Sequence, residues 1–136
     1  MSKHYVLDSY AILTLLNDEL GAERVEAILR LATEEKIVAT MSLINLGEIA
    51  YIVERRWGES RVKTLLAYLE SINLQMARVD YPRVMAAAHI KAKHPLSYAD
   101  AFAAALTQEL NAILITGDPE FKAVETIITI EWLPRE

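Results

Sequence analysis

The segment from residue 96 to residue 121, LSYADAFAAALTQELNAILITGDPEF, constrains the fold more than any other part of the sequence. Its pattern predicts a buried alanine-rich helix, a short break at Asn111, an aliphatic strand, and then a turn that presents Thr116 and Asp118. Another acid, Asp100, lies near the start of the helix. The two carboxylates are therefore expected at one end of a βα-type unit, where open α/β sheets usually bind their ligands.

Short apolar runs alternate with helical patterns along the rest of the chain. The runs that predict strands are residues 5–7, 37–39, 74–79 and 127–130. A helix is expected from the N-cap Ser42 to about Trp57, where Gly58 ends it, and further helices from about residues 10, 21, 59 and 82. This alternation predicts a three-layer α/β/α fold with a central parallel sheet of four to five short strands. At 136 residues the chain has room for one domain, so residues 1–136 are expected to form a single unit.

The composition limits the class of protein. Hydrophobic residues make up 53% of the chain, which indicates a well-filled core, yet the longest apolar runs are far shorter than the ~18 residues of a membrane span. We expect a soluble cytoplasmic protein without a signal peptide. The chain has no cysteine, which excludes disulfides, thiolate nucleophiles and cysteine-bound metals. The net charge of −5 argues against nucleic-acid binding by bulk electrostatics.

Three of the acids have simple structural explanations when each is taken alone. Asp8 directly precedes an apolar helix and suits an N-cap. Ser97 and Asp100 have the S-x-x-D spacing of a capping box, so Asp100 could serve only its own helix. Asp118, with Pro119 behind it, suits a cap or an Asx-turn.

The acids become more informative as a set, because Glu48 joins them. Glu48 lies beyond the first turn of its helix and has apolar neighbours, so its carboxylate needs a partner. In a right-handed βαβ arrangement, strand exits and the following helix starts share one edge of the sheet. Asp8, Glu48, Asp100 and Asp118 would then meet in one cleft. Such a cluster requires a cation, and ligation by oxygen alone favours Mg²⁺ or Mn²⁺.

Three segments carry a resemblance to a known family. They are YVLDSYAIL, INLGEIAYIV and the segment 96–121. In this order they resemble the PIN domain, and specifically the small VapC toxins of prokaryotic toxin–antitoxin pairs. The resemblance covers essentially the whole chain, and the most specific part is the A-D-A helix followed by a T-x-D turn and a phenylalanine.

The resemblance implies a Mg²⁺- or Mn²⁺-dependent endoribonuclease that hydrolyses RNA phosphodiester bonds. The catalytic and metal-binding residues that it implies are Asp8, Glu48, Asp100 and Asp118. Thr116 matches the hydroxyl of the T-x-D motif and would support the site, as would Ser9 after the first acid. Glu120 could add a further acid, although a solvated turn residue is the favoured interpretation.

The resemblance also implies partners. The protein would be the toxin of a type II toxin–antitoxin module, with an RNA substrate, a VapB-like antitoxin, no membrane association and a homodimeric state for which Tyr51 and Ile52 offer a surface. Two residues depart from the family pattern: Tyr10 is bulkier than expected, and Asn45 replaces a hydroxyl. Both departures bear on substrate access and specificity.

Other functions remain open from the sequence. A PIN-like module could bind RNA or protein without cleavage, or the chain could be a stand-alone RNA-processing nuclease. A phosphoacceptor receiver domain is a further small α/β protein with an acidic pocket. It would need paired acids after the first strand and a late lysine, whereas Ser9 and Tyr10 follow Asp8 and no lysine lies between Leu114 and Phe121.

Overall fold

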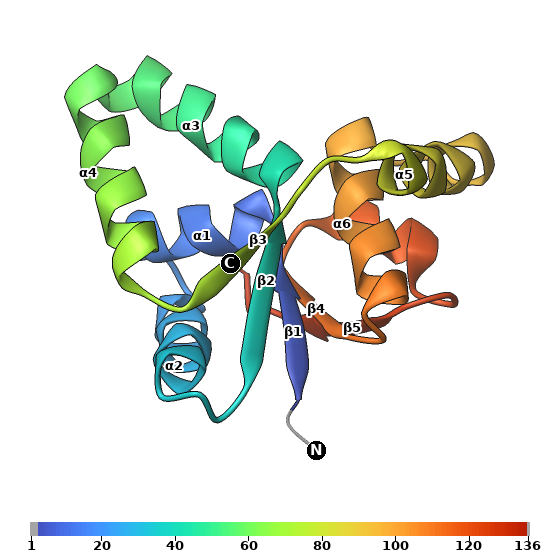
Figure 1. The fold of residues 1–136 in the computed structure, drawn as a ribbon, viewed down its shortest axis with the longest axis horizontal. Coiled ribbons are helices and arrows are strands. Elements are labelled where there is room, and N and C mark those ends of the chain that lie inside the picture. The colour runs from blue at the N-terminus through green and yellow to red at the C-terminus, as the bar shows by residue number, and fades with distance from the viewer. Residues whose placement is uncertain (1–2, 136) are drawn as a thin grey trace.

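A central sheet of five parallel strands organises the protein (Figure 1). The structure, a computed structural model, describes residues 3–135. The strands are β1 (His4–Leu7), β2 (Val38–Ser42), β3 (Leu74–Ala77), β4 (Ile113–Thr116) and β5 (Thr129–Trp132). Their order across the sheet is β3-β2-β1-β4-β5, and every pairing is parallel. The parallel sheet predicted from the alternating pattern is confirmed.

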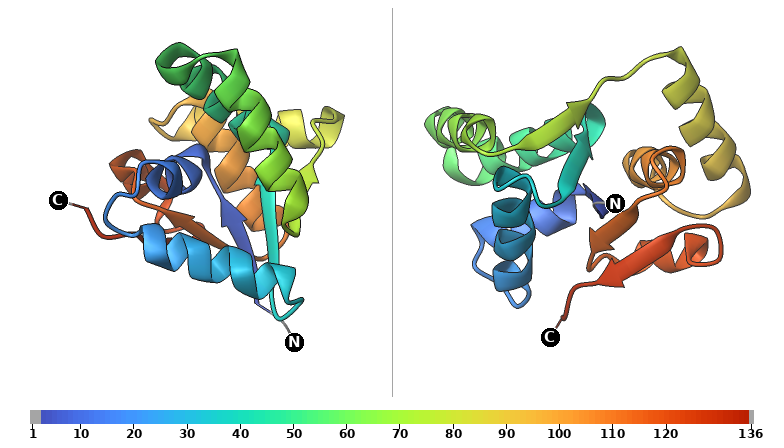
Figure 2. Two further views of the ribbon diagram at one scale, coloured as in Figure 1. Left: turned by 90° about the vertical axis from the view of Figure 1, so that its left-hand side faces the viewer. Right: turned by 60° about the horizontal axis from the view of Figure 1, so that its bottom comes forward.

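Helices cover both faces of this sheet, as Figures 1 and 2 show. They are α1 (Ser9–Leu16), α2 (Ala22–Thr33), α3 (Leu43–Trp57), α4 (Glu59–Ser71), α5 (Tyr81–Lys93), α6 (Tyr98–Glu109) and the 3₁₀ helix η1 (Pro119–Val124). Helices α1, α2 and α4 with most of α3 pack on one face, and α5, α6 and η1 pack on the other. The fold is therefore a three-layer α/β/α arrangement.

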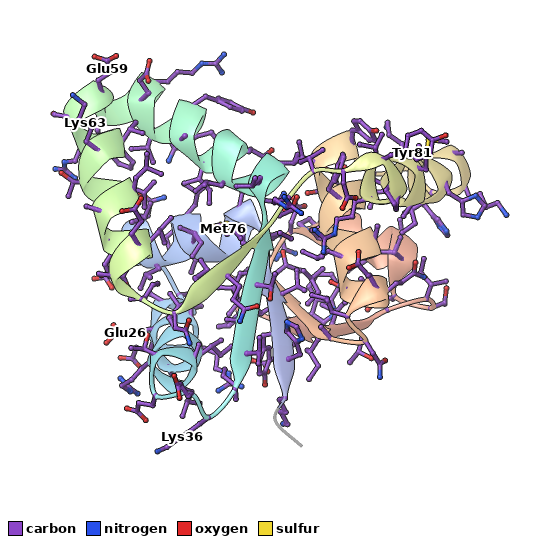
Figure 3. All side chains as sticks on the ribbon, viewed as in Figure 1. Glu26, Lys36, Glu59, Lys63, Met76 and Tyr81 are labelled. Atoms are coloured by element: carbon purple, nitrogen blue, oxygen red, sulfur yellow. The ribbon has the colours of Figure 1, made fainter. Side chains whose placement is uncertain are left out.

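The two faces of the sheet bury separate hydrophobic cores because successive strand residues point to opposite sides. In β1, Tyr5 and Leu7 join the core beneath α1 to α4, while Val6 joins the core beneath α5 and α6. In β4, Ile115 and Leu114 divide in the same way. The charged side chains labelled in Figure 3, those of Glu26, Lys36, Glu59 and Lys63, are all exposed, whereas Asp8 and Asp100 are buried. Within residues 3–135, no helix is both long enough and apolar enough to cross a membrane.

Local signals place most of the element ends. Ser42 caps α3 by accepting a hydrogen bond from the N–H of Ile44, and Gly58 follows Trp57 with a φ of 90° that favours glycine. Asn111 breaks the chain between α6 and β4 with a φ of 50°. These three predictions are confirmed.

The predicted limits of four strands differ from the structure. The first strand begins one residue earlier, at His4, the second begins one residue later and continues to Ser42, and the third ends at Ala77. The last strand is Thr129–Trp132, whereas residues 127–130 were expected. The cause is a local turn, because the N–H groups of Ile127 and Ile128 both donate to the carbonyl oxygen of Val124. The turn withdraws these two apolar residues from the sheet.

Candidate metal centre

The site begins where β1 and β4 end side by side. Leu7 pairs with Ile115 in this parallel ladder, so the residues that follow, Asp8 and Thr116, emerge at the same edge. The hydroxyl of Thr116 donates a hydrogen bond of 2.6 Å to Oδ2 of Asp8, and the same hydroxyl oxygen accepts a bond of 3.0 Å from the N–H of Asp118. One threonine therefore links two of the predicted acids.

Asp8 is both a helix cap and a buried member of the site. It is the N-cap of α1, and its Oδ1 accepts a hydrogen bond of 3.0 Å from the N–H of Ala11. Only 1% of the residue is exposed. Burial raises the pKa of Asp8 from its ordinary 3.8 to about 7; the bonds from Thr116 and Ala11 oppose the rise, and the charges of Asp100 and Asp118 add to it.

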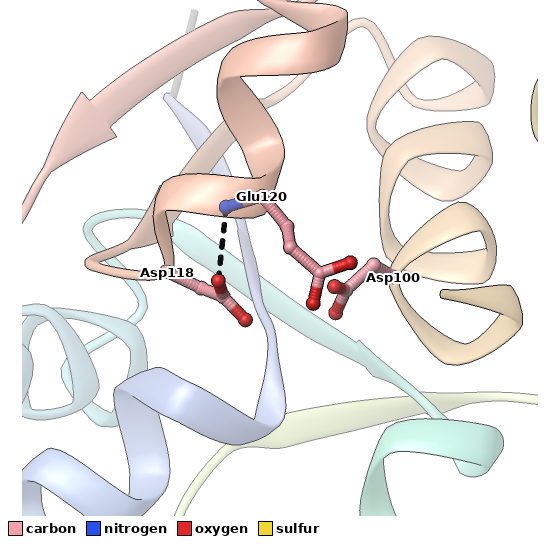
Figure 4. A group of neighbouring side chains, drawn as sticks. All are labelled: Asp100, Asp118 and Glu120. Carbon is pink, nitrogen blue, oxygen red and sulfur yellow. Dashed lines mark hydrogen bonds between the residues drawn. The ribbon is translucent and has the colours of Figure 1, made fainter. Parts of the chain in front are cut away.

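Three carboxylates come closest to one another: those of Asp100, Asp118 and Glu120 (Figure 4). One oxygen from each lies within 4.8 Å of the others. Asp100 is in the first turn of α6, Asp118 is the N-cap of η1, and Glu120 is in the first turn of η1. Oδ1 of Asp118 accepts a 3.0 Å hydrogen bond from the N–H of Glu120, drawn as the dashed line in Figure 4. The starts of α6 and η1 thus carry all three carboxylates of the cluster.

The capping box expected at the start of α6 is only half formed. The hydroxyl oxygen of Ser97 accepts a 3.1 Å hydrogen bond from the N–H of Asp100, as expected. The N–H of Ser97, which a full capping box would direct to Asp100, instead donates to Oε1 of Glu120 at 3.1 Å. Glu120 therefore takes over the capping bond, and the Asp100 carboxylate faces the cluster.

The environment of Asp100 is electrostatically unfavourable without a cation. Burial raises the pKa of Asp100 to about 7, and the charges of Asp118, Glu120 and Glu48 raise it further, whereas the hydrogen bond with Ser97 opposes the rise. The contribution of Glu48 shows that it lies within electrostatic reach of this group.

Glu48 has the partner that its apolar surroundings required. Ser9, at the start of α1, donates a short hydrogen bond to Oε1 of Glu48 on α3. The structure thus brings all four predicted acids to this edge of the sheet, but the tightest cluster contains Asp100, Asp118 and Glu120 in place of Asp8 and Glu48.

Glu120 has a larger part in the cluster than its sequence position indicates. Its side chain is exposed, as expected for a solvated turn residue, but its carboxylate joins those of Asp100 and Asp118. The DPEF sequence gives one signal, because a Pro following the N-cap Asp118 starts a helical turn and places Glu120 in that turn. Its contact with Ser97 joins residues 23 positions apart and has no local signature.

Asn45, which like Tyr10 departs from the family pattern, joins α3 to α6. It is fully buried, and its Nδ2 donates a 3.3 Å hydrogen bond to the carbonyl oxygen of Ala99, next to Asp100. Its Oδ1 has no hydrogen-bond partner among residues 3–135. Asn45 therefore fixes the start of α6 relative to the helix that carries Glu48.

The donor set fits a hard divalent cation. All of the candidate ligands are carboxylate oxygens, which Mg²⁺ and Mn²⁺ prefer. The raised pKa values of Asp8 and Asp100 reflect burial and crowded negative charge, and a bound cation would relieve the crowding.

Comparisons with known proteins identify the family of this chain. The PIN domain family model matches residues 5–127. A curated protein of Mycolicibacterium smegmatis, Ribonuclease VapC, is 31% identical over 121 residues, which are 84% of this chain and 86% of that protein.

Solved structures share the fold at lower identity. VapBC2 of Rickettsia felis, bound to a promoter DNA fragment, superposes with a TM-score of 0.75 at 16% identity, covering 96% of this chain and 99% of the other. VapC20 of Mycobacterium tuberculosis, described as a sarcin-ricin loop cleaving toxin, gives a TM-score of 0.73 at 22% identity with the same coverage. From the family match and the curated relative we conclude that the chain belongs to the PIN domain family and, within it, to the VapC group.

Proposed function

We propose that this protein is a Mg²⁺- or Mn²⁺-dependent endoribonuclease that hydrolyses RNA phosphodiester bonds. The observation that carries the proposal is the convergence of Asp8, Glu48, Asp100, Asp118 and Glu120 at one edge of the parallel sheet. The names of two relatives support it: one is called a ribonuclease, and one is described as cleaving the sarcin-ricin loop. Fold alone would not suffice, because one fold serves many functions.

The acids of the site differ in how closely they lie to one another. Asp100, Asp118 and Glu120 lie closest together and would hold the cation. Each oxygen of Asp8 accepts one hydrogen bond, from Ala11 or Thr116, and keeps a lone pair, so Asp8 would add a buried ligand and also fix the turn after β4.

Glu48 would complete the acidic site from the opposite helix, and Ser9 holds its carboxylate in place. A bound divalent cation would lower the pKa of a water molecule and neutralise charge on the scissile phosphate. The protein would hold the carboxylates in place before the cation binds, through the hydrogen bonds at the starts of α6 and η1.

The test is RNA cleavage by the purified protein. We expect activity with Mg²⁺ or Mn²⁺, none with EDTA, and a loss of about 100-fold or more in Asp100→Asn and Asp118→Asn. Asp80→Asn is the matched control, because Asp80 caps α5 near the end of α6 opposite Asp100, and asparagine caps as well as aspartate. Cleavage that survives EDTA, or folded site variants with full activity, would contradict the proposal.

We further propose that the enzyme is the toxin of a type II toxin–antitoxin module, acts in the cytoplasm on RNA, and pairs with a VapB-like antitoxin. Several similar structures are VapBC complexes, which supports such a partner. Expression of the chain alone should arrest growth, and coexpression of a small protein encoded immediately upstream should relieve the arrest. Growth without arrest, and no such reading frame, would favour a stand-alone RNA-processing nuclease.

We also propose that the whole chain acts as one PIN-like domain and as a homodimer. Tyr51, one of the residues expected to serve the dimer, is 48% exposed on α3. Sedimentation equilibrium should give twice the 15.3 kDa chain mass. A monomer over the working concentration range would contradict the dimer.

A further inference from the structure

Tyr10 packs against the turn that joins two residues of the candidate metal centre. The turn is Thr116–Gly117–Asp118, and Tyr10 is the second residue of α1, two positions after Asp8. A methyl group added to Gly117 would lie 2.5 Å from Cε1, 2.9 Å from Cζ and 3.1 Å from the hydroxyl oxygen of Tyr10. The Tyr10 ring therefore occupies the space that a side chain at position 117 would need.

The requirement for glycine at position 117 is steric. Gly21 and Gly58 have positive φ values of 101° and 90°, whereas Gly117 is not among the glycines with positive φ. Its backbone conformation is open to other residues, and the obstacle is the ring of Tyr10. Gly117 is buried beneath that ring.

The ring of Tyr10 borders both the hydrophobic core and open space. Tyr10 packs against the hydrophobic core that includes Leu7 and Ala11. It also lines two hollows of about 400 and 460 Å³, which α1 shares with the following loop, Arg56 and Arg135. A side chain at position 117 would therefore displace the ring toward these hollows and break its contact with the turn.

Two separate contacts join the segment Asp8–Tyr10 to the segment Thr116–Asp118. The first is the hydrogen bond from Thr116 to Asp8, and the second is the packing of Tyr10 on Gly117. The hydroxyl of Thr116 ties the two ends of the turn together, because it also accepts the N–H of Asp118. Between these ends the ring of Tyr10 lies against Gly117, so the ring limits how far the turn can shift toward α1 and where it directs Asp118.

We propose that Tyr10 is a positioning residue for the candidate metal centre: its ring, seated on Gly117, holds the turn so that the Asp118 carboxylate stays beside that of Asp100. This role rests on the proposed function, but it predicts a change in cation affinity, which is measured separately from RNA cleavage. It also explains why a bulky residue stands at position 10. The ring of Tyr10 fills the space beside Gly117 and replaces none of the acids.

The experiment measures Mn²⁺ affinity by calorimetry for the full chain and its variants. Gly117→Ala and Tyr10→Ala should each weaken Mn²⁺ binding by about 10-fold or more, as loss of supporting contacts does at metal sites. Because Tyr10→Ala also removes the ring that the added methyl group meets, the double variant should bind Mn²⁺ about as weakly as Tyr10→Ala alone, well short of the product of the two effects. Tyr10→Phe keeps the ring and should bind Mn²⁺ like the wild type.

The matched control is Gly47→Ala on α3, where an added methyl group meets nothing within 4 Å. It should leave Mn²⁺ binding unchanged. Circular dichroism in EDTA would identify any variant that fails to fold. If Gly117→Ala fails to fold, the difference in Mn²⁺ affinity between Tyr10→Ala and Tyr10→Phe decides whether the ring positions the turn.

Wild-type Mn²⁺ affinity in Tyr10→Ala, or independent effects that multiply in the double variant, would overturn the positioning role. A wild-type protein that binds Mn²⁺ but does not cleave RNA would contradict the proposed function alone, and the Mn²⁺ titrations would still decide the role of Tyr10.

Discussion

The hydroxyl of Thr116 donates a 2.6 Å hydrogen bond to Oδ2 of Asp8 across 108 positions of sequence. The bond lies at the carboxyl ends of the neighbouring strands β1 and β4, and both residues are buried. Because the same hydroxyl oxygen accepts the N–H of Asp118, Thr116 connects the most buried acid of the site to the metal-facing cluster.

Replacement of Thr116 tests this connection. Thr116→Val keeps the shape but leaves Oδ2 of the buried Asp8 without its donor, so we expect a loss of about 1–3 kcal/mol in the free energy of unfolding. RNA cleavage should fall as well, because the N–H of Asp118 loses its acceptor. Thr116→Ser retains the hydroxyl and is the control. Chemical denaturation and cleavage assays measure both effects, and a valine variant equal to wild type in both would refute the connection.

Glu120 has two functions that one pair of variants separates. Glu120→Gln keeps an oxygen that can accept the N–H of Ser97 but removes the charge, so Mn²⁺ affinity should fall while stability in EDTA stays close to wild type. Glu120→Ala removes both. The freed N–H of Ser97 would then compete for the Asp100 carboxylate, and we expect a larger loss of Mn²⁺ affinity. Equal, wild-type affinity in both variants would exclude Glu120 from the site.

The raised pKa values predict how stability depends on pH. Asp8 and Asp100 have pKa values of about 7 in the folded protein, against an ordinary 3.8. Between these values the folded state binds more protons than the unfolded state, so these groups favour folding below about pH 4 and lose that contribution as the pH rises through about 7. In EDTA, thermal unfolding should show Asp100→Asn gaining stability over wild type as the pH rises from about 5 to about 8.

Mg²⁺ should reverse this trend. A cation requires deprotonated carboxylates, so saturating Mg²⁺ should raise the melting temperature of the wild type more at about pH 8 than at about pH 5. Asp100→Asn should show a smaller increase at both values. An increase independent of pH would contradict the assignment of these acids to the cation.

The ion pair of Arg24 and Glu131 should affect stability alone. Arg24 on α2 contacts both carboxylate oxygens of Glu131 on β5, at 2.7 and 3.0 Å, and donates to the hydroxyl of Tyr5. Because the side chains are 43% and 33% exposed, we expect Arg24→Ala to cost less than about 1 kcal/mol. RNA cleavage at saturating Mg²⁺ should remain unchanged. A comparable loss of cleavage would show that β5 is coupled to the site.

Much of the fold follows from local sequence. The alternation of short apolar runs and helices specifies parallel strands, because parallel neighbours need a crossover connection. Residues 127–130 show where prediction of a strand from an apolar run fails, because such a run can also continue a turn. Here the carbonyl oxygen of Val124 accepts the N–H groups of Ile127 and Ile128, and the strand begins only at Thr129. Strand limits depend on such competing hydrogen bonds, which a pattern of hydrophobicity does not contain.

The local sequence was enough to predict that Asp8, Ser97 and Asp118 cap helical segments, since a cap needs only residues two or three positions apart. The tertiary structure alone decided which carboxylate accepts the N–H of Ser97 and that Tyr10 packs on Gly117. These contacts join residues far apart in the chain, where several groups compete for one donor or one space. Only the packing of the layers sets the distances that settle that competition.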